Sequence, residues 1–343
     1  MKKSLIALAV AGVVSAPAFA ATANVDVYGK MHVSVSLYDD QPNTTNDVQV
    51  SSNASRIGFK GAEDLGGGLS AIWQLESTVD LDEQGGSFAT RNSFVGLKGG
   101  FGTVIAGTND TPLKNVGRKI DLFGDTIADS RNVMGQGSDT RAKNMVAYMS
   151  PSFSGLDFAA AYSTDLGAAS TAGDADNSSV YNLSATYANG PLFLGLGYGD
   201  GDGHEKAGFG KHMRAAAGYT FGAFKLVGQY DKRDDDNTLN AGAQNGDFNA
   251  WLVGGSFTMG AMVFKANYMD GDFDGVGAAD PKQWTVGMDY NLSKRTTVYA
   301  LYADAENFSL GRGVGSTDQV GGTGVAPATG DVSAFSLGIT HTF

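Results

Sequence analysis

The stretch Val25–Tyr38 reads VDVYGKMHVSVSLY and alternates strictly between two kinds of residue. Its odd positions are apolar or glycine, and its even positions carry charged, hydroxyl or imidazole groups. A period of two predicts a β-strand with one apolar and one polar face. The stretch is longer than most strands of soluble proteins, and it is long enough to cross a membrane at a tilt.

The same alternation recurs along the chain. Comparable segments are Leu69–Val79, Leu156–Thr164, Val180–Tyr187, Arg214–Phe221, Gln283–Tyr290 and Val332–Phe343. Strands with so polar a second face fit a closed barrel with lipid outside and water inside. Closure is required because each unpaired backbone group in hydrocarbon costs several kcal/mol. Counting segments predicts an all-β, antiparallel transmembrane barrel of about 16 strands, a size that leaves an aqueous channel.

The connections alternate in length. Short ones include Gly66-Gly67-Gly68, Asn189-Gly190 and Phe221-Gly222. Long, polar ones are Asp39–Ala54, Asp165–Ser179, Asp200–Lys211, Lys232–Asp247, Asp270–Lys282 and Asp304–Asp331. Short periplasmic turns and long outer loops are typical of outer-membrane barrels.

The first residues predict export. Lys2 and Lys3 precede an apolar run, Leu5–Val14, and Ala18-Phe19-Ala20 has the A-x-A form of a cleavage site. Met1–Ala20 is therefore interpreted as a secretory signal peptide, which leaves 21–343 as a single barrel domain. The chain has no cysteine and needs no disulfide framework in an oxidising compartment. Its 36 acidic against 24 basic residues argue against a nucleic-acid partner, which favours a basic face.

The alternation stops in Thr108–Arg141, a stretch longer than an ordinary connection. It carries charges of both signs: Lys114, Arg118, Lys119 and Arg131 with Asp110, Asp121, Asp125, Asp129 and Asp139. We expect this stretch, residues 108–141, to fold inward as the third outer loop and to narrow the channel.

Six positively charged residues occupy positions on the polar side of the alternation. They are Lys30, Arg56, Lys60, Arg91, Arg141 and Lys143. For Arg91, this assignment takes the apolar Phe94 as lipid-facing. A guanidinium in hydrocarbon costs about 2–4 kcal/mol at the midplane, so we expect these side chains in the lumen. Two interpretations remain open: the cations form a charged wall that sets ion selectivity, or they are solvated lumen residues that touch nothing.

Catalysis and metal binding find little support in the sequence. The four histidines, His32, His204, His212 and His341, form no recognisable triad, and there is no GxSxG elbow. Asp270–Gly275 matches the first half of a calcium loop, but Pro281 stands where the motif needs a bidentate glutamate. We therefore expect no enzyme, no metal site and no cofactor.

Several ordered stretches carry a family resemblance. They are Val27–Lys30, Ser55–Gly61, Arg91–Leu97, Phe101–Val104, Tyr148–Leu156, Tyr290–Thr296 and the terminal Phe343. In this order and spacing the chain resembles the general porins of Gram-negative bacteria, which are trimeric and 16-stranded. The resemblance covers essentially the whole mature chain.

The resemblance implies an outer-membrane channel for passive diffusion of ions and small hydrophilic solutes. It implies a constriction with a basic wall of Lys30, Arg56, Arg91 and Arg141, and with acidic loop groups at Asp121, Asp125 and Asp129. It further implies a homotrimer among outer-membrane lipid and lipopolysaccharide, and a Phe343 that is read by the barrel-assembly machinery. The loop departs from the pattern because Lys114 and Arg118 are among four cations beside its acids.

Two other functions stay open at this point. A substrate-specific outer-membrane channel would need an aromatic path or a binding site along the lumen, and the inward parity contains no run of aromatic residues. A membrane-embedded enzyme or adhesin would need a recognition motif in the long loops, and none is evident.

Overall fold

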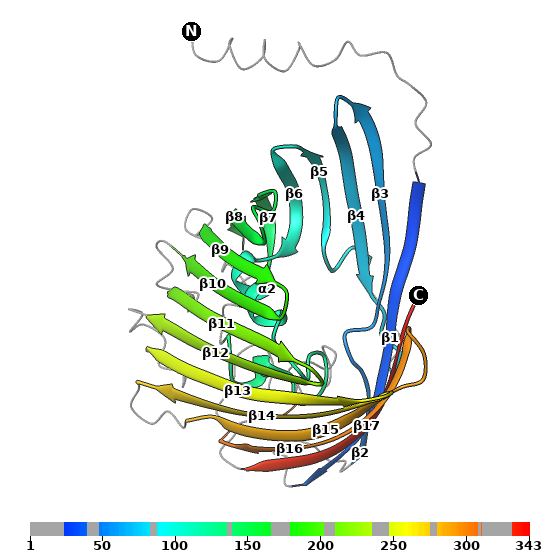
Figure 1. Ribbon diagram of the computed structural model, residues 1–343, viewed down its shortest axis with the longest axis vertical. Coiled ribbons are helices and arrows are strands. Elements are labelled where there is room, and N and C mark those ends of the chain that lie inside the picture. Colours follow the sequence, from blue (N-terminus) through cyan, green and yellow to red (C-terminus); the bar gives the residue numbers. More distant parts are fainter. Residues whose placement is uncertain are drawn as a thin grey trace, which may run out of the picture.

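In a computed structural model, seventeen strands form one antiparallel sheet (Figure 1). The structure describes residues 24–39, 48–82, 88–135, 139–165, 179–201, 210–234, 247–274, 280–307, 310 and 331–343. The predicted signal peptide, Met1–Ala20, lies outside the described residues. No helix in these ranges is long and apolar enough to cross a membrane.

The first half of the sheet contains nine strands. They are β1 (Asn24–Asp39), β2 (Val48–Ser52), β3 (Arg56–Gly66), β4 (Leu69–Thr78), β5 (Ser93–Gly99), β6 (Gly102–Asp110), β7 (Arg141–Met149), β8 (Leu156–Asp165) and β9 (Val180–Asn189). The remaining strands are β10 (Leu192–Asp200), β11 (Lys211–Phe221), β12 (Phe224–Asp234), β13 (Phe248–Met259), β14 (Met262–Phe273), β15 (Lys282–Asn291), β16 (Thr296–Glu306) and β17 (Val332–Thr342).

The sheet closes on itself where β1 pairs with β17, with Lys30 opposite Thr342. On its other edge β1 pairs with β2 and then with β3. β2 and β3 therefore pair with successive parts of the same edge of β1 and together act as one strand of the barrel. A break at Ala54, whose φ is 52°, separates them. Seventeen strands thus fill sixteen places, and the predicted barrel is confirmed.

One predicted loop was too long. Asp39–Ala54 was expected to be a loop, but its second part is the strand β2. Val48 and Val50 face outward, while Ser51 lies buried on the opposite, inner face. The alternation is present there, but only five residues carry it, which is too few to stand out from a polar loop.

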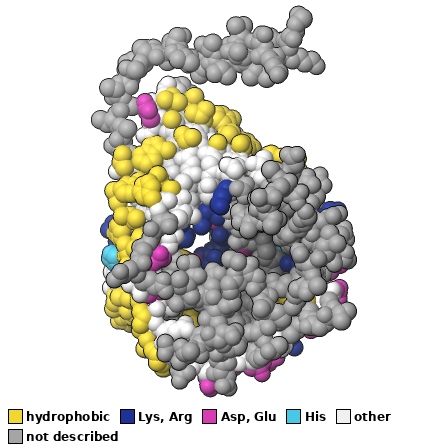
Figure 2. Space-filling model, turned by 180° about the vertical axis from the view of Figure 1, so that it is seen from behind, with side chains coloured by type: hydrophobic (Ala, Val, Ile, Leu, Met, Phe, Trp, Pro, Cys, Tyr) yellow, Lys and Arg dark blue, Asp and Glu magenta, His cyan; other side chains and the backbone are white. Residues whose placement is uncertain are grey.

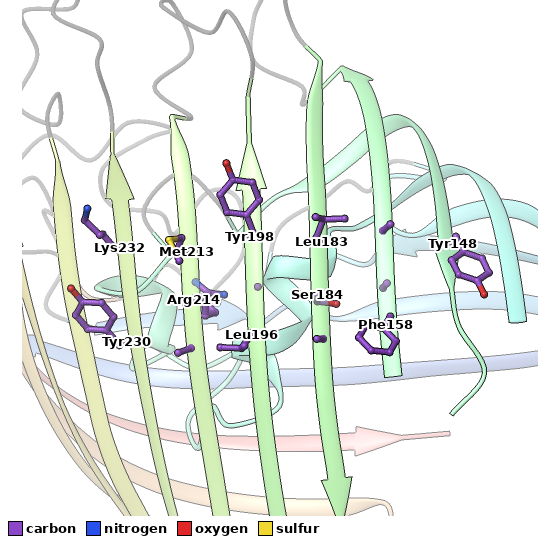
Figure 3. A pocket seen from close by; sticks show the side chains of 15 residues that line it. Tyr148, Phe158, Leu183, Ser184, Leu196, Tyr198, Met213, Arg214, Tyr230 and Lys232 are labelled. Atoms are coloured by element: carbon purple, nitrogen blue, oxygen red, sulfur yellow. The ribbon is translucent and has the colours of Figure 1, made fainter. Parts of the chain in front are cut away.

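The two faces of the barrel follow the predicted parity. Val27, Val35 and Leu337 are exposed on the outside, where a membrane protein meets lipid. His32, Ser34 and Ser336 are buried on the inside. The outer face is not smooth. A groove of about 680 Å³ lies on β7–β12. Small residues line it among large ones such as Tyr148, Leu196 and Tyr230 (Figure 3).

The inward or outward direction of Phe94 was predicted wrongly. Val95 and Leu97 are the exposed apolar residues of β5, and Phe94 packs inside against the buried cluster that contains Ile105 and Met145. The inner wall is locally apolar at this point, so an apolar side chain does not identify the lipid face. Arg91 still points inward, because β5 begins only at Ser93 and the chain bends before it.

The connection lengths match the prediction. Short turns join the strands at one end of the barrel, and positive φ values at Gly67 (62°), Gly190 (56°) and Gly222 (58°) close three of them. The strand ends that the long connections join lie at the other end, and one of these connections joins β6 to β7.

Candidate pore constriction

The segment between β6 and β7 lies inside the ring (Figure 1). It begins with the helix α2 (Pro112–Arg118), which packs on β8, β9, β10 and β11. Thr111 caps the helix by accepting a hydrogen bond from the Lys114 amide at 3.3 Å, and Pro112 occupies the first turn, where its missing N–H is not needed. A short 3₁₀ turn, η1 (Ser130–Asn132), follows. We call residues 111–140 the constriction loop.

Buried polar contacts tie this loop to the inner wall. The Arg214 guanidinium of β11 bonds to Asp231 of β12 at 2.6 Å and to Asp139 of the loop at 2.7 Å. The Gly135 amide donates to the same Asp231 carboxylate at 2.8 Å. Further along the ring, Asn132 donates to Gln283 of β15 at 2.8 Å. The loop is therefore fixed at several strands.

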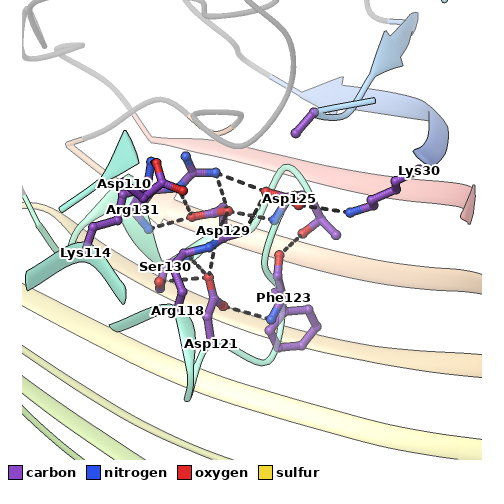
Figure 4. Close-up of polar contacts among 12 residues, drawn as sticks. Lys30, Asp110, Lys114, Arg118, Asp121, Phe123, Asp125, Asp129, Ser130 and Arg131 are labelled. Atoms are coloured by element: carbon purple, nitrogen blue, oxygen red, sulfur yellow. Dashed lines mark hydrogen bonds and ion pairs between the residues drawn. The ribbon is translucent and has the colours of Figure 1, made fainter. Parts of the chain in front are cut away.

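A network of charged side chains lies on the loop (Figure 4). Asp129 accepts hydrogen bonds from Arg118 at 3.0 Å and from Arg131 at 2.7 Å, and it also accepts from the Asp125 amide at 2.7 Å. Asp125 bonds to Arg118 at 2.7 Å and to Lys30 of β1 at 2.9 Å. Arg56 of β3 lies 3.8 Å from the same carboxylate. Asp125 thus joins the loop to the predicted basic wall.

Asp121 is buried next to this network. Its carboxylate accepts from the Phe123 amide at 2.9 Å and from the Ser130 hydroxyl at 2.9 Å, and Arg118 lies at 3.8 Å. Burial, with the nearby Asp129 charge, raises the pKa of Asp121 to about 6. Burial also raises the pKa of Asp125, but Lys30 and Arg118 outweigh it and hold that pKa well below its usual range.

A second group of contacts lies where the loop leaves the wall. Lys114 bonds to Asp110 at 2.8 Å, and Arg141 of β7 reaches the same carboxylate at 3.2 Å. Burial lowers the pKa of Lys114, and the Asp110 charge opposes that shift. On the wall itself, Glu76 of β4 accepts from Arg91 and lies 3.7 Å from Arg56.

The two most water-accessible charged side chains among these contacts are cations. The side chains of Arg118 and Arg56 are 28% and 26% exposed, whereas those of Asp121 and Asp129 are 1% and 0% exposed. Figure 2 shows Lys and Arg side chains around an opening, next to an apolar outer flank. Asp121 and Asp129 lie behind guanidinium groups, whereas Asp110 is 20% exposed beside Arg141.

All the predicted constriction residues fall in these two groups of contacts. Lys30, Arg56 and Asp125 meet directly, and Arg118 lies among Asp121, Asp125 and Asp129. Arg91 and Arg141 lie farther along the wall, the latter with Lys114 at Asp110. Sequence reasoning did not single out Glu76, the acid that holds Arg56 and Arg91. Its position among the polar residues of the alternating segment Leu69–Val79 indicated that it faces the lumen.

The candidate calcium loop gains no support. Within the described residues, no group of three or more His, Asp or Glu side chains has the arrangement to hold a metal ion. Asp270 accepts a hydrogen bond from Tyr268 at 3.2 Å, and the Pro281 carbonyl accepts one from the Gly271 amide. Gly275 lies outside the described residues.

A closed barrel that is apolar outside and charged inside, with a charged loop along its inner wall, defines a channel of the outer membrane. Such a pore carries water-soluble solutes by passive diffusion. The sequence pattern of the family described as Gram-negative porin matches residues 7–310. The chain belongs to this family, whose members are channels rather than enzymes.

Individual relatives agree with this assignment. The chain is 30% identical to the major outer membrane protein P.IB of Neisseria gonorrhoeae over 329 residues, covering 87% of this chain and 91% of that protein. It is 31% identical to the outer membrane porin protein 32 of Delftia acidovorans, covering 90% of each.

Solved structures show the same fold. An anion-selective porin from Comamonas acidovorans superposes with a TM-score of 0.75 at 28% identity, covering 94% of this chain and all of that one. The trimer form of OmpT of Vibrio cholerae superposes with a TM-score of 0.66 at 17% identity, covering 94% and 99%.

Proposed function

We propose that this porin favours anions, and that its selectivity is set where the constriction loop faces the wall formed by β1, β3, β4 and β7. The cations that line this constriction are Lys30, Arg56, Arg91, Lys114, Arg118, Arg131 and Arg141. The observation that carries the proposal is the burial of Asp121 and Asp129 behind Arg118 and Arg131.

The charge balance of the constriction supports the same sign. Seven cations face five acids there, the acids being Glu76, Asp110, Asp121, Asp125 and Asp129. Walls of charge set the ion preference of a pore, and low-dielectric walls focus their field into the water between them. The net charge of −12 for the whole chain does not predict this local excess. The Comamonas porin described above is named anion-selective, which is a second support.

Reversal potentials test the proposal. In a planar bilayer with a potassium chloride gradient, the wild-type channel should show a chloride permeability above that of potassium. Arg118→Gln with Arg131→Gln should reduce this ratio, because the substitutions remove the two cations that cover the buried acids. Lys294→Gln removes a positive charge from an exposed turn and serves as the control. A wild-type channel that prefers potassium would exclude the proposal.

We also propose that the mature chain, from about Ala21, assembles as a homotrimer among outer-membrane lipid and lipopolysaccharide, with Phe343 read during assembly. The apolar outer face and the trimeric relative support the trimer. Phe343 closes the ring by exchanging backbone hydrogen bonds with Gly29 at 3.0 and 3.2 Å. The mass of the detergent-solubilised particle and the N-terminal sequence of the mature protein test these points.

A further inference from the structure

Glycines on the inner wall lie where the constriction loop touches it. Gly195 and Gly197 of β10 face inward, because Leu194 and Leu196 between and beside them are exposed on the outside. The loop places Val116 over Gly195 and Leu113 over Gly197. A glycine inside a strand commonly marks the close approach of another chain segment.

The available space at these positions is too small for a side chain. A Cβ added to Gly197 would lie 2.6 Å from Cδ1 of Leu113 and 3.2 Å from its Cα. A Cβ added to Gly195 would lie 2.8 Å from Cγ1 of Val116. The short distance to the backbone of Leu113 is decisive, because a backbone atom moves only if the helix moves.

The pattern continues along the loop in order. A Cβ on Gly254 of β13 would lie 3.2 Å from Leu122, and one on Gly287 of β15 would lie 2.9 Å from Phe123. Successive apolar residues of the loop therefore meet glycines on successive parts of the wall. We call these four glycines, Gly195, Gly197, Gly254 and Gly287, the glycine seat.

We propose that the glycine seat sets how far the constriction loop projects into the lumen, and thereby sets the open cross-section. The inference rests on the proposed constriction role of the loop. The apolar side of the loop lies in the seat, and Arg118 and Arg131 lie on its charged, water-facing side. A side chain in the seat would lift the helix away from the wall and move these cations further into the channel, since packed interiors do not absorb an added group.

The chain offers a matched control. Gly228 of β12 lies on the outward parity shared by Leu226 and Tyr230. A Cβ added there would meet only the Leu252 carbonyl oxygen, at the ordinary distance of 3.6 Å. Gly228→Val therefore adds the same side chain to a neighbouring part of the sheet without touching the loop.

Single-channel recording of the full-length protein in planar bilayers tests the proposal. Gly197→Val should lower the conductance, whereas Gly228→Val should leave it at the wild-type value. Heat-modifiable electrophoretic mobility establishes that each variant is a folded barrel. If Gly197→Val folds poorly, Gly197→Ala replaces it, and adding Leu113→Ala should restore the conductance in part, because it removes the 2.6 Å contact with Cδ1 but leaves the backbone of residue 113 in place.

A folded Gly197→Val channel with wild-type conductance would overturn the glycine seat, as would an equal loss in Gly228→Val. Wild-type selectivity is measured in the same bilayers. A potassium-preferring wild type would remove the proposed anion preference, while the comparison of conductances would still decide whether the glycines position the loop.

Discussion

At the scale of single residues, the constriction separates charges by accessibility. Asp129 has no exposed side-chain surface and is held by Arg118 and Arg131. Truncating one partner of a buried ion pair is costly because it leaves the other charge unpaired. The acids therefore act mainly to fix the guanidinium groups in place, and those groups present their charge to the water.

Titration of Asp121 makes the stability of the folded state depend on pH. Its pKa is raised to about 6 by burial and by Asp129, so between about pH 4 and pH 6 the folded protein keeps a proton that the unfolded chain has lost. The folded state is therefore stabilised as the pH falls through 6 and loses this contribution as the pH rises. A shift of this size corresponds to about 3 kcal/mol at most.

We expect Asp121→Asn to remove that dependence. Urea unfolding of the barrel in lipid, measured at pH 7.5 and pH 5, should show the wild type gaining stability relative to the variant at the lower pH. The two proteins share every other titrating group, so those contributions cancel. A difference between wild type and variant that is the same at both pH values would contradict the assignment.

At the scale of elements, Arg214 joins the loop to two strands. Its fully buried guanidinium bonds to Asp231 and Asp139, and α2 leaves room for it at Gly117, where a Cβ would lie 2.6 Å from Nη1. This contact fixes the end of the loop opposite Asp125. The loop is thus held at both sides of the channel, which favours a fixed rather than a fluctuating opening.

Arg214→Met should destabilise the barrel by about 3–5 kcal/mol, because it leaves Asp231 and Asp139 buried without their partner. Lys211→Met removes an exposed cation from the same strand and should change stability by no more than about 0.5 kcal/mol. Urea midpoints of both variants check this, and the open-channel noise of Arg214→Met should increase. Equal midpoints would contradict the expected cost of leaving Asp231 and Asp139 without their partner.

The sequence predicts the strands well where one of their faces must meet lipid. In β1, β11 and β15 the lipid side requires apolar residues, so parity alone places His32, Arg214 and Gln283 inside. Parity fails at Phe94, because a patch of the inner wall is apolar too. The pairing of Lys30 with Asp125, and of Asn132 with Gln283, depends on the path of a loop across the lumen, and no local pattern encodes that path.

At the scale of the whole molecule, the net charge and the constriction have opposite signs. The chain carries −12, yet the cations exceed the acids where the loop meets the wall. An ion is influenced by charges within about one Debye length, which is about 3 Å in 1 M salt and 10 Å in 0.1 M salt. In 1 M salt even the charges of the constriction are largely screened.

The ratio of chloride to potassium permeability should therefore rise as the salt concentration is lowered from 1 M to 0.1 M. Reversal potentials at a fixed concentration ratio, repeated at several mean concentrations, measure this. Arg118→Gln with Arg131→Gln should flatten the rise, because fewer fixed cations remain to be unscreened. A wild-type ratio that falls over this range would mean that the net negative charge of the chain, and not the constriction, controls which ions enter.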